Sequence, residues 1–167
     1  MPGPHDIRQL PADRESLASL IALHHLCLPS RLYATPQQQA AFLDEVLDAL
    51  AGRESLVLAS FADASPVAYK IAYRTGNRHE TLYSWLGGVH PSHRGRGHAR
   101  ALLLCQHQLA SAMGVTQVET HVWGDNTAML VLNLRQGFHV AGTVAGPDKP
   151  GVRVILRKSL VAPTLPR

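Results

Sequence analysis

The feature that most constrains the fold is a basic, glycine-containing segment that separates a strand pattern from a helix pattern. It spans residues 89–99 and reads VHPSHRGRGHA. Its two glycines allow backbone conformations that other residues avoid, so several N–H groups can point at one anion. The helix that follows adds the partial positive charge of its N-terminus. The segment therefore predicts a strand, an anion-binding loop and a helix in succession.

The rest of the hydrophobic pattern predicts a single mixed α/β domain. Apolar residues at helical spacing, with capping signals at the ends, predict helices at 14–28, 35–51, 98–113 and 126–136. Alternating or continuous apolar runs predict strands at 55–61, 67–73, 81–89, 115–123, 138–144 and 152–156. Because no repeat and no long linker divides the chain, we expect one domain over residues 1–167, with a frayed tail at 161–167.

Composition excludes several classes of protein. The 167 residues are 46% hydrophobic, which is enough for a packed core, and no apolar run reaches the roughly 18 residues of a membrane span. The first residues lack the basic-then-apolar order of a secretion signal, so we expect a cytoplasmic protein. The net charge of +4 is compatible with an anionic ligand but also with an ordinary surface.

Three kinds of anion-binding loop have to be compared with residues 89–99. A Walker loop ends in Gly-Lys-Ser/Thr, which is absent here. A dinucleotide-binding fingerprint needs a third glycine where Arg100 stands. The third pattern fits: Arg94-x-x-Gly97-x-Ala99, with Val89 five residues before the arginine, resembles the acyl-coenzyme A signature of the GNAT N-acetyltransferase superfamily.

The resemblance extends to most of the chain, over roughly residues 10–160. Asn126, Leu132 and Gly137-Phe138 have the spacing of a second conserved block of that superfamily. The order of predicted helices and strands is also similar. The resemblance implies an α+β fold with a mixed, mostly antiparallel central sheet of about six to seven strands, flanked by about four helices. Its central strands would splay apart to admit the pantetheine arm of the cofactor.

The resemblance also implies acetyl-coenzyme A as co-substrate and assigns residues to it. Residues 94–99 would bind the pyrophosphate through main-chain N–H groups, Val89 would offer backbone groups to the pantetheine amides, and Asn126 would hydrogen-bond the arm. The full set of residues assigned to the cofactor is Val89, His90, Arg94, Gly95, Arg96, Gly97, His98, Ala99, Asn126 and Asn133. Arg94, Arg96 and Arg100 would add formal positive charge. The alternatives are that the glycines only form a turn and that Asn126 only caps a helix.

The catalytic groups depart from the superfamily pattern. Many members carry a tyrosine seven residues after the asparagine, which protonates the departing thiolate, but this chain has Asn133 there. An amide can hydrogen-bond the sulfur but cannot donate a proton with a useful pKa. Histone-modifying members place a glutamate six residues before the valine, where this chain has Tyr83. We therefore assign Tyr83 and Asn133 as catalytic candidates, and Tyr83 with Trp85 as walls of the acceptor pocket.

Other titratable residues lie on or beside the predicted central strands. Glu80, Glu119 and His121 could act as a base, and a histidine titrates near neutral pH. We nevertheless favour the interpretation that His121 is a surface histidine or one that only makes structural hydrogen bonds. The chain has ten histidines, but those near the loop have no cysteine or acidic partner, so we expect no metal site.

Three smaller expectations concern packing. The pair Gly87-Gly88 near a strand end predicts a bulge or a close backbone approach. Lys70 lies on a strand face that either lines an acceptor pocket or is solvated, and we favour the solvated position. Cys27 and Cys105 lie in apolar helical patterns and are expected to be buried, reduced thiols.

These observations favour an N-acetyltransferase that transfers an acetyl group from acetyl-coenzyme A to a primary amine by direct attack in a ternary complex. The alternative is a module that binds or senses acyl-coenzyme A without turnover. A nucleic-acid patch is disfavoured because the basic loop has no stacking aromatic residue beside it. The expected partner is a small-molecule or peptide amine rather than nucleic acid or a membrane, and homodimers are common among proteins of this resemblance.

Overall fold

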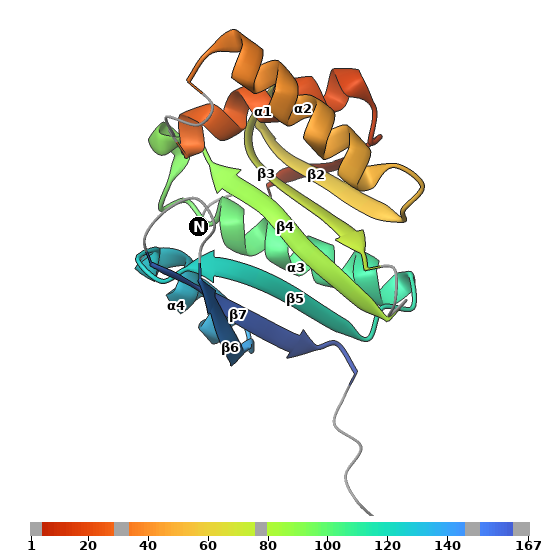
Figure 1. Cartoon of the computed structure of the whole chain (residues 1–167), viewed down its shortest axis with the longest axis vertical. Coiled ribbons are helices and arrows are strands. Elements are labelled where there is room, and N and C mark those ends of the chain that lie inside the picture. Colours follow the sequence, from red (N-terminus) through yellow and green to blue (C-terminus); the bar gives the residue numbers. More distant parts are fainter. Residues whose placement is uncertain (1–4, 29–33, 76–79, 146–150, 162–167) are drawn as a thin grey trace, which may run out of the picture. The chain divides into compact units, whose positions relative to one another are not determined.

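The computed structural model describes residues 5–28, 34–75, 80–145 and 151–161. Within these residues the chain forms four α-helices and one seven-stranded sheet, which confirms the expected fold class (Figure 1). The helices are α1 (Arg14–Cys27), α2 (Pro36–Leu50), α3 (His98–Ala112) and α4 (Thr127–Arg135). The strands are β1 (Asp6–Leu10), β2 (Ser55–Ala62), β3 (Ser65–Arg74), β4 (Thr81–Val89), β5 (Gln117–Trp123), β6 (His139–Ala145) and β7 (Val152–Ser159).

The sheet has the strand order β1-β2-β3-β4-β5-β7-β6. Strands β1 and β2, β2 and β3, β5 and β7, and β6 and β7 pair antiparallel, whereas β4 and β5 pair parallel. The parallel pairing covers only three residue pairs, Thr81–Tyr83 with Gln117–Glu119. The sequence pattern did not predict β1, because this strand has only five residues and its two apolar side chains, Ile7 and Leu10, are only half-buried.

The described chain forms two compact units. Unit 1 comprises residues 1–73 and 86–106, and unit 2 comprises residues 74–85 and 107–167. The boundaries between them fall inside β3, β4 and α3 rather than in linkers. Among the described helices, none combines the length and the hydropathy that a membrane crossing requires. The expected frayed tail lies outside the described residues except for Val161.

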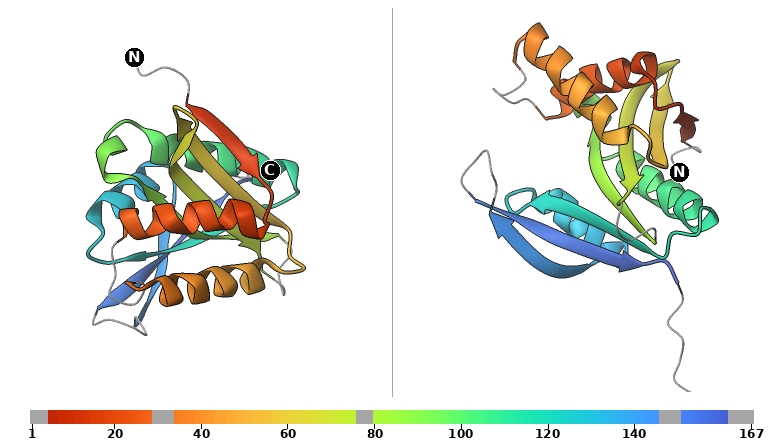
Figure 2. Two further views of the ribbon diagram at one scale, coloured as in Figure 1. Left: turned by 90° about the horizontal axis from the view of Figure 1, so that it is seen from above. Right: turned by 45° about the vertical axis from the view of Figure 1, so that its right-hand side comes forward.

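Unit 1 has helices on both faces of β2 and β3. Figure 2 shows α1 and α2 on one face and α3 on the other. Tyr69 of β3 points to the first face, where its hydroxyl is hydrogen-bonded to His24 of α1. Ser60 of β2 points to the second face, where its hydroxyl lies 2.9 Å from Nδ1 of His98. Both faces are therefore core, which explains why Val67–Ala72 is buried throughout instead of alternating.

Lys70 is buried among the core residues of unit 1, so its expected solvated position is wrong. The residue is only 7% exposed. Its side chain runs past Gly87, where an added Cβ would lie 3.7 Å from Cγ and 3.9 Å from Nζ of the lysine. The missing side chain of Gly87 makes room for the lysine stem. Burial lowers the pKa of Lys70 from 10.5 to about 8.

The close approach expected at Gly87-Gly88 is confirmed. A Cβ at Gly88 would lie 2.8 Å from Cβ of Cys27 and 3.1 Å from Cε1 of Tyr69, so no larger residue fits there. Both cysteines are free thiols, as expected. Cys27 is buried, and burial raises the pKa of its thiol to about 11. Cys105 is only half-buried, which departs from the expectation.

Unit 2 has α4 against one face of β5, β6 and β7 (Figure 1). Nζ of Lys158 on β7 donates to the carbonyl of Gln136 at the end of α4, at 2.7 Å. Neighbouring residues on a strand point to opposite faces, so Arg157 of β7 and its cross-strand partner Glu119 of β5 point away from α4. Within the described part of unit 2, this second face is left half-exposed.

Candidate functional site

The loop between β4 and α3 has the backbone conformation that its glycines permit. A short 3-10 helix, Pro91–His93, follows β4, and α3 begins at His98. Gly95 and Gly97 have φ angles of +74° and +87°, in the left-handed region that side chains disfavour. A Cβ at Gly95 would meet nothing within 4 Å, so the strained backbone rather than crowding explains the glycine there.

The N-terminus of α3 has no capping side chain at Gly97, and Nε2 of His5 lies 3.4 Å from the position of an added Cβ there. Gly97 occupies the capping position, and its carbonyl accepts from the N–H of Ala101 at 3.0 Å. Glycine has no side chain that could accept from the first N–H groups of the helix. Among the described residues, no acceptor takes their place. Free N–H groups together with the helix dipole suit a phosphate or pyrophosphate oxygen.

The three arginines of the segment have different surroundings. Arg94 donates from Nη2 to the carbonyl of Cys27 at 2.9 Å and from Nε to that of Val89 at 3.4 Å. This side chain therefore ties the loop to the end of α1 and to β4. Arg96 and Arg100 are exposed and leave their charge at the loop surface.

Histidines surround the same loop. His98 is 8% exposed, and burial, reinforced by neighbouring positive charges, lowers its pKa. The Ser92 hydroxyl lies 2.7 Å from Nδ1 of His90 and 3.0 Å from Nδ1 of His93. Over the described ranges, no three His, Cys, Asp or Glu side chains are grouped so that they could hold a metal ion. These histidines fix the loop through hydrogen bonds to hydroxyls.

The two asparagines of the second conserved block lie at opposite ends of α4 in unit 2. Oδ1 of Asn126 caps this helix by accepting from the N–H of Met129 at 3.2 Å. Asn133 is 1% exposed, and its Nδ2 donates to the carbonyl of Met129 at 2.9 Å. Asn126 therefore has the capping role that was one of its two interpretations. Its cofactor role, and both roles assigned to Asn133, stay predictions.

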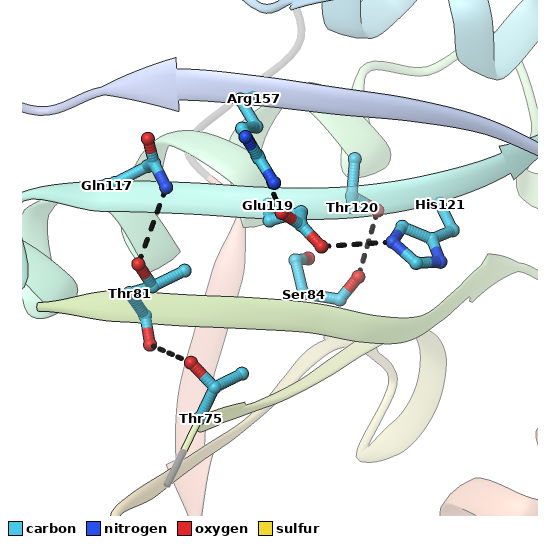
Figure 3. A network of polar contacts seen from close by, with 8 residues as sticks. All are labelled: Thr75, Thr81, Ser84, Gln117, Glu119, Thr120, His121 and Arg157. Carbon is cyan, nitrogen blue, oxygen red and sulfur yellow. Dashed lines mark hydrogen bonds and ion pairs between the residues drawn. The ribbon is translucent and has the colours of Figure 1, made fainter. Parts of the chain in front are cut away.

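A polar network occupies the half-exposed face of unit 2 (Figure 3). Nε of Arg157 donates to Oε2 of Glu119 at 2.7 Å, and Nε2 of His121 lies 3.0 Å from Oε1 of the same carboxylate. Burial alone would raise the pKa of Glu119, but the hydrogen bonds and charges of Arg157 and His121 outweigh burial and lower it. The carboxylate is therefore ionised at neutral pH.

A small polar pocket of about 220 Å³ adjoins this network. It is lined by Thr75, Thr81, Gln117, Glu119 and Arg157. Thr81 and Gln117 form the first of the three parallel β4–β5 pairs, and Glu119 belongs to the third, so the pocket lies where the two strands are paired. Beyond the last pair, the Thr120 hydroxyl donates to the carbonyl of Ser84 at 2.8 Å.

Tyr83 of β4 contacts the network. The rings of Tyr83 and His121 meet edge to face, with centroids 5.1 Å apart and planes at 66°. The sequence interpretation gave His121 little weight and omitted Arg157. Arg157 reaches Glu119 only through the cross-strand register of β5 and β7, which no sequence pattern shows.

Comparison with known families gives one match that covers most of the chain. Residues 4–126 match the family described as the acetyltransferase (GNAT) domain. No curated protein sequence matches the chain significantly.

Solved structures of acetyltransferases are similar in fold. The ribosomal-protein-S18-alanine N-acetyltransferase of Escherichia coli superposes with a TM-score of 0.74 at 17% identity, covering 98% of this chain and 100% of that one. A putative acetyltransferase of Salmonella typhimurium, solved with its cofactor acetyl-CoA, gives 0.70 at 18% identity and covers 99% of both chains. The PaiA N-acetyltransferase of Thermoplasma acidophilum, in complex with coenzyme A, gives 0.70 at 18% identity, covering 93% of this chain and 99% of that one. The family match and the fold agree, and the chain belongs to the GNAT acetyltransferase family.

Proposed function

We propose that this protein transfers the acetyl group of acetyl-coenzyme A to a primary amine by direct attack, with both substrates bound at once. Acetyl-CoA-dependent acetyl transfer is general for the family, and two similar structures contain acetyl-CoA or coenzyme A. The S18-alanine enzyme acts, by its name, on an amine. The amine class of the acceptor and the ternary complex are the steps that the proposal adds.

The loop before α3 is the observation that carries the proposal. Its two glycines have left-handed φ angles and directly precede the N-terminus of α3, where main-chain N–H groups and the helix dipole favour an anion. A pyrophosphate satisfies such groups without any side chain. His90 and the residues from Arg94 to Ala99 would hold the phosphates in this way, while backbone groups of Val89 would bind the pantetheine amides.

Direct attack needs no nucleophilic residue from the protein. The amine nitrogen forms a bond to the thioester carbonyl carbon, the C–S bond breaks with its electron pair going to sulfur, and the nitrogen loses a proton. Positioning of the two substrates and hydrogen bonds to the developing oxyanion supply the rate acceleration. Cys27 is buried, and burial raises the pKa of its thiol to about 11, which argues against an acetyl-cysteine intermediate.

The experiment is a coupled assay of thiol release and product mass. The protein is incubated with acetyl-coenzyme A and a panel of primary amines: amino acids, peptides with a free N-terminus, lysine-containing peptides and small alkylamines. The proposal predicts thiol release that depends on the amine, and a product heavier by one acetyl group. Coenzyme A binding without release for any amine would indicate a binding module and overturn the proposal.

The same panel separates direct attack from an acetyl-enzyme route. In a ternary mechanism, initial rates at several concentrations of both substrates give intersecting double-reciprocal lines, and Cys27→Ser and Cys105→Ser retain activity. Parallel lines together with an acetylated protein in the absence of amine would contradict direct attack.

A further inference from the structure

The half-exposed face of unit 2 holds a histidine whose ring is oriented by a carboxylate. Glu119 and Arg157 lie directly opposite each other in the β5–β7 register, and His121 follows two residues later on the same face. The side chains of Glu119, His121 and Arg157 keep 22%, 21% and 40% of their surface accessible. These three side chains are therefore partly buried and still accessible to a ligand.

The hydrogen bonds fix which nitrogen of His121 is basic. The Glu119 carboxylate is ionised because its pKa is lowered, so it can only accept. Nε2 of His121 must therefore donate to Oε1, which leaves the lone pair of the neutral ring on Nδ1. Across the residues that the structure describes, nothing else bonds to Nδ1, and the ring is partly accessible.

The groups around the ring suit proton uptake. When Nδ1 takes a proton, the adjacent carboxylate stabilises the imidazolium. Arg157 holds the second oxygen of Glu119 at 2.7 Å, which keeps the carboxylate ionised and in place. Three other titratable or charged groups of the described part of unit 2 lie on this face: Tyr83 of β4, at 5.1 Å between ring centroids, Arg153 of β7, and His139 of β6, which pairs with Arg157.

We propose that His121 is the general base of the acetyl transfer, with Glu119 and Arg157 as positioning residues. This inference rests on the proposed function. The amine lone pair forms the C–N bond, the C–S electron pair leaves on sulfur, and the proton of the amine passes to Nδ1 of His121. The amine attacks in its neutral form, and its nitrogen becomes positively charged as the C–N bond forms. A base is needed to take the one proton that the nitrogen must lose to give the neutral amide.

The first test is His121→Gln, assayed with the primary amine that gives the fastest thiol release with the unmodified protein. The glutamine amide can still donate to Glu119 but is not basic, so the network is kept while the base is lost. We expect kcat/KM for the amine to fall by about 100-fold at neutral pH, within the usual range for loss of a general base. Coenzyme A affinity should stay within about twofold, since positioning of the cofactor is unaffected. His139→Gln, at an exposed histidine of β6, is the matched control and should change neither value.

The second test is the pH profile of kcat/KM. Substitution of His121 would leave the shape of this profile unchanged if the residue had a purely structural role. We expect an acid limb in the kcat/KM profile of the unmodified protein, and we expect His121→Gln to lack it, because the glutamine amide takes up no proton. Glu119→Gln keeps the histidine but loses the group that orients it, so this variant should keep the acid limb and lower kcat/KM by about tenfold. This variant keeps the assay informative if His121→Gln does not fold.

The outcomes distinguish a failure of the proposed function from a failure of the base assignment. If the unmodified protein releases no thiol with any amine, the proposed function is wrong and the base assignment with it. If it turns over but His121→Gln keeps more than a third of its activity with an unchanged acid limb, only the base assignment is wrong. Unchanged kcat/KM in Glu119→Gln would likewise overturn the role of Glu119 as a positioning residue. In His121→Ala, recovery of activity with added imidazole would support the base directly.

Discussion

The loop of unit 1 and the network of unit 2 present reactive groups by opposite means. The loop exposes main-chain N–H groups, and its decisive residues, Gly95 and Gly97, matter because they lack side chains. The network consists of side chains, Glu119, His121 and Arg157, on adjacent antiparallel strands. A backbone site depends on local conformation, whereas the side-chain site depends on register between strands that are distant in sequence.

The two units also differ in whether their charged side chains are paired. Arg157 and Glu119 neutralise each other on a half-exposed face of unit 2. Lys70 of unit 1 is buried, and among the described residues no carboxylate pairs with it. A paired charge costs little to keep ionised, while a buried unpaired one is driven toward its neutral form. The comparison therefore predicts opposite responses to removing charge from the two units.

The largest effect is expected at Gly97. Gly97→Glu places a carboxylate at the N-terminus of α3 and a side chain at a φ of +87°, so coenzyme A should bind at least about 100-fold more weakly by calorimetry. Gly52→Glu is the matched control, because Gly52 also has a left-handed φ, +68°, and lies in open space after α2. Equal affinity in Gly97→Glu and the unmodified protein would contradict a main-chain phosphate site.

The next effect concerns the buried lysine. The difference between a folded pKa of about 8 and the usual 10.5 corresponds to about 3 kcal/mol of lost stability at neutral pH. The unfolded chain holds its proton more tightly, so this loss is complete below pH 8 and disappears as pH rises toward 10.5. Lys70→Met should therefore raise the free energy of unfolding by about 1–3 kcal/mol at pH 7, and by much less at pH 10.

Urea unfolding at the two pH values measures this effect. Lys158→Met removes the same charge from unit 2, where Nζ donates to the carbonyl of Gln136, and should destabilise the protein instead. A destabilised Lys70→Met would show that the ammonium makes a stabilising interaction.

The sequence predicted the strand, loop and helix around residues 89–99 well because the determinants of this local structure are close in sequence. The glycine positions, the strand before the loop and the helix after it all lie within about thirty residues, and each has its own pattern. The predicted strand at 81–89 also agrees with the structure, as does the helix cap that was the alternative interpretation of Asn126. Local patterns thus describe most helices and strands.

The contacts of the side-chain network were not predicted, although Glu119 and His121 were named as candidates, because these contacts are not local in sequence. Arg157 meets Glu119 only because β5 and β7 pair in one particular register, and a shift by one residue would turn Arg157 to the α4 face. Lys70 was misplaced for a similar reason: the space for its stem is provided by Gly87, on a different strand. Pairing partners, and hence which side chains meet, do not follow from the periodicity of a single segment.

A smaller effect is expected for Arg157→Met, which removes the group that holds Glu119. We expect kcat/KM for the amine to fall by about tenfold, with unchanged coenzyme A affinity, because the site loses orientation but keeps its histidine. Arg153→Met, on the same strand face over Trp123, is the control and should retain activity. Loss of coenzyme A affinity in Arg157→Met would show that the two regions are not separable in function.

The smallest effect is expected for the exposed arginines of the loop. If main-chain groups dominate phosphate binding, Arg96→Gln and Arg100→Gln should each weaken coenzyme A binding by only about two- to threefold at low salt. At about 0.5 M salt the difference should vanish, because exposed charges are screened over a few ångströms. Arg94→Gln should weaken binding more and independently of salt, since Arg94 acts by holding the carbonyls of Cys27 and Val89. A steep salt dependence in the first two variants, with a loss as large as that of Gly97→Glu, would instead assign the site to side-chain charge.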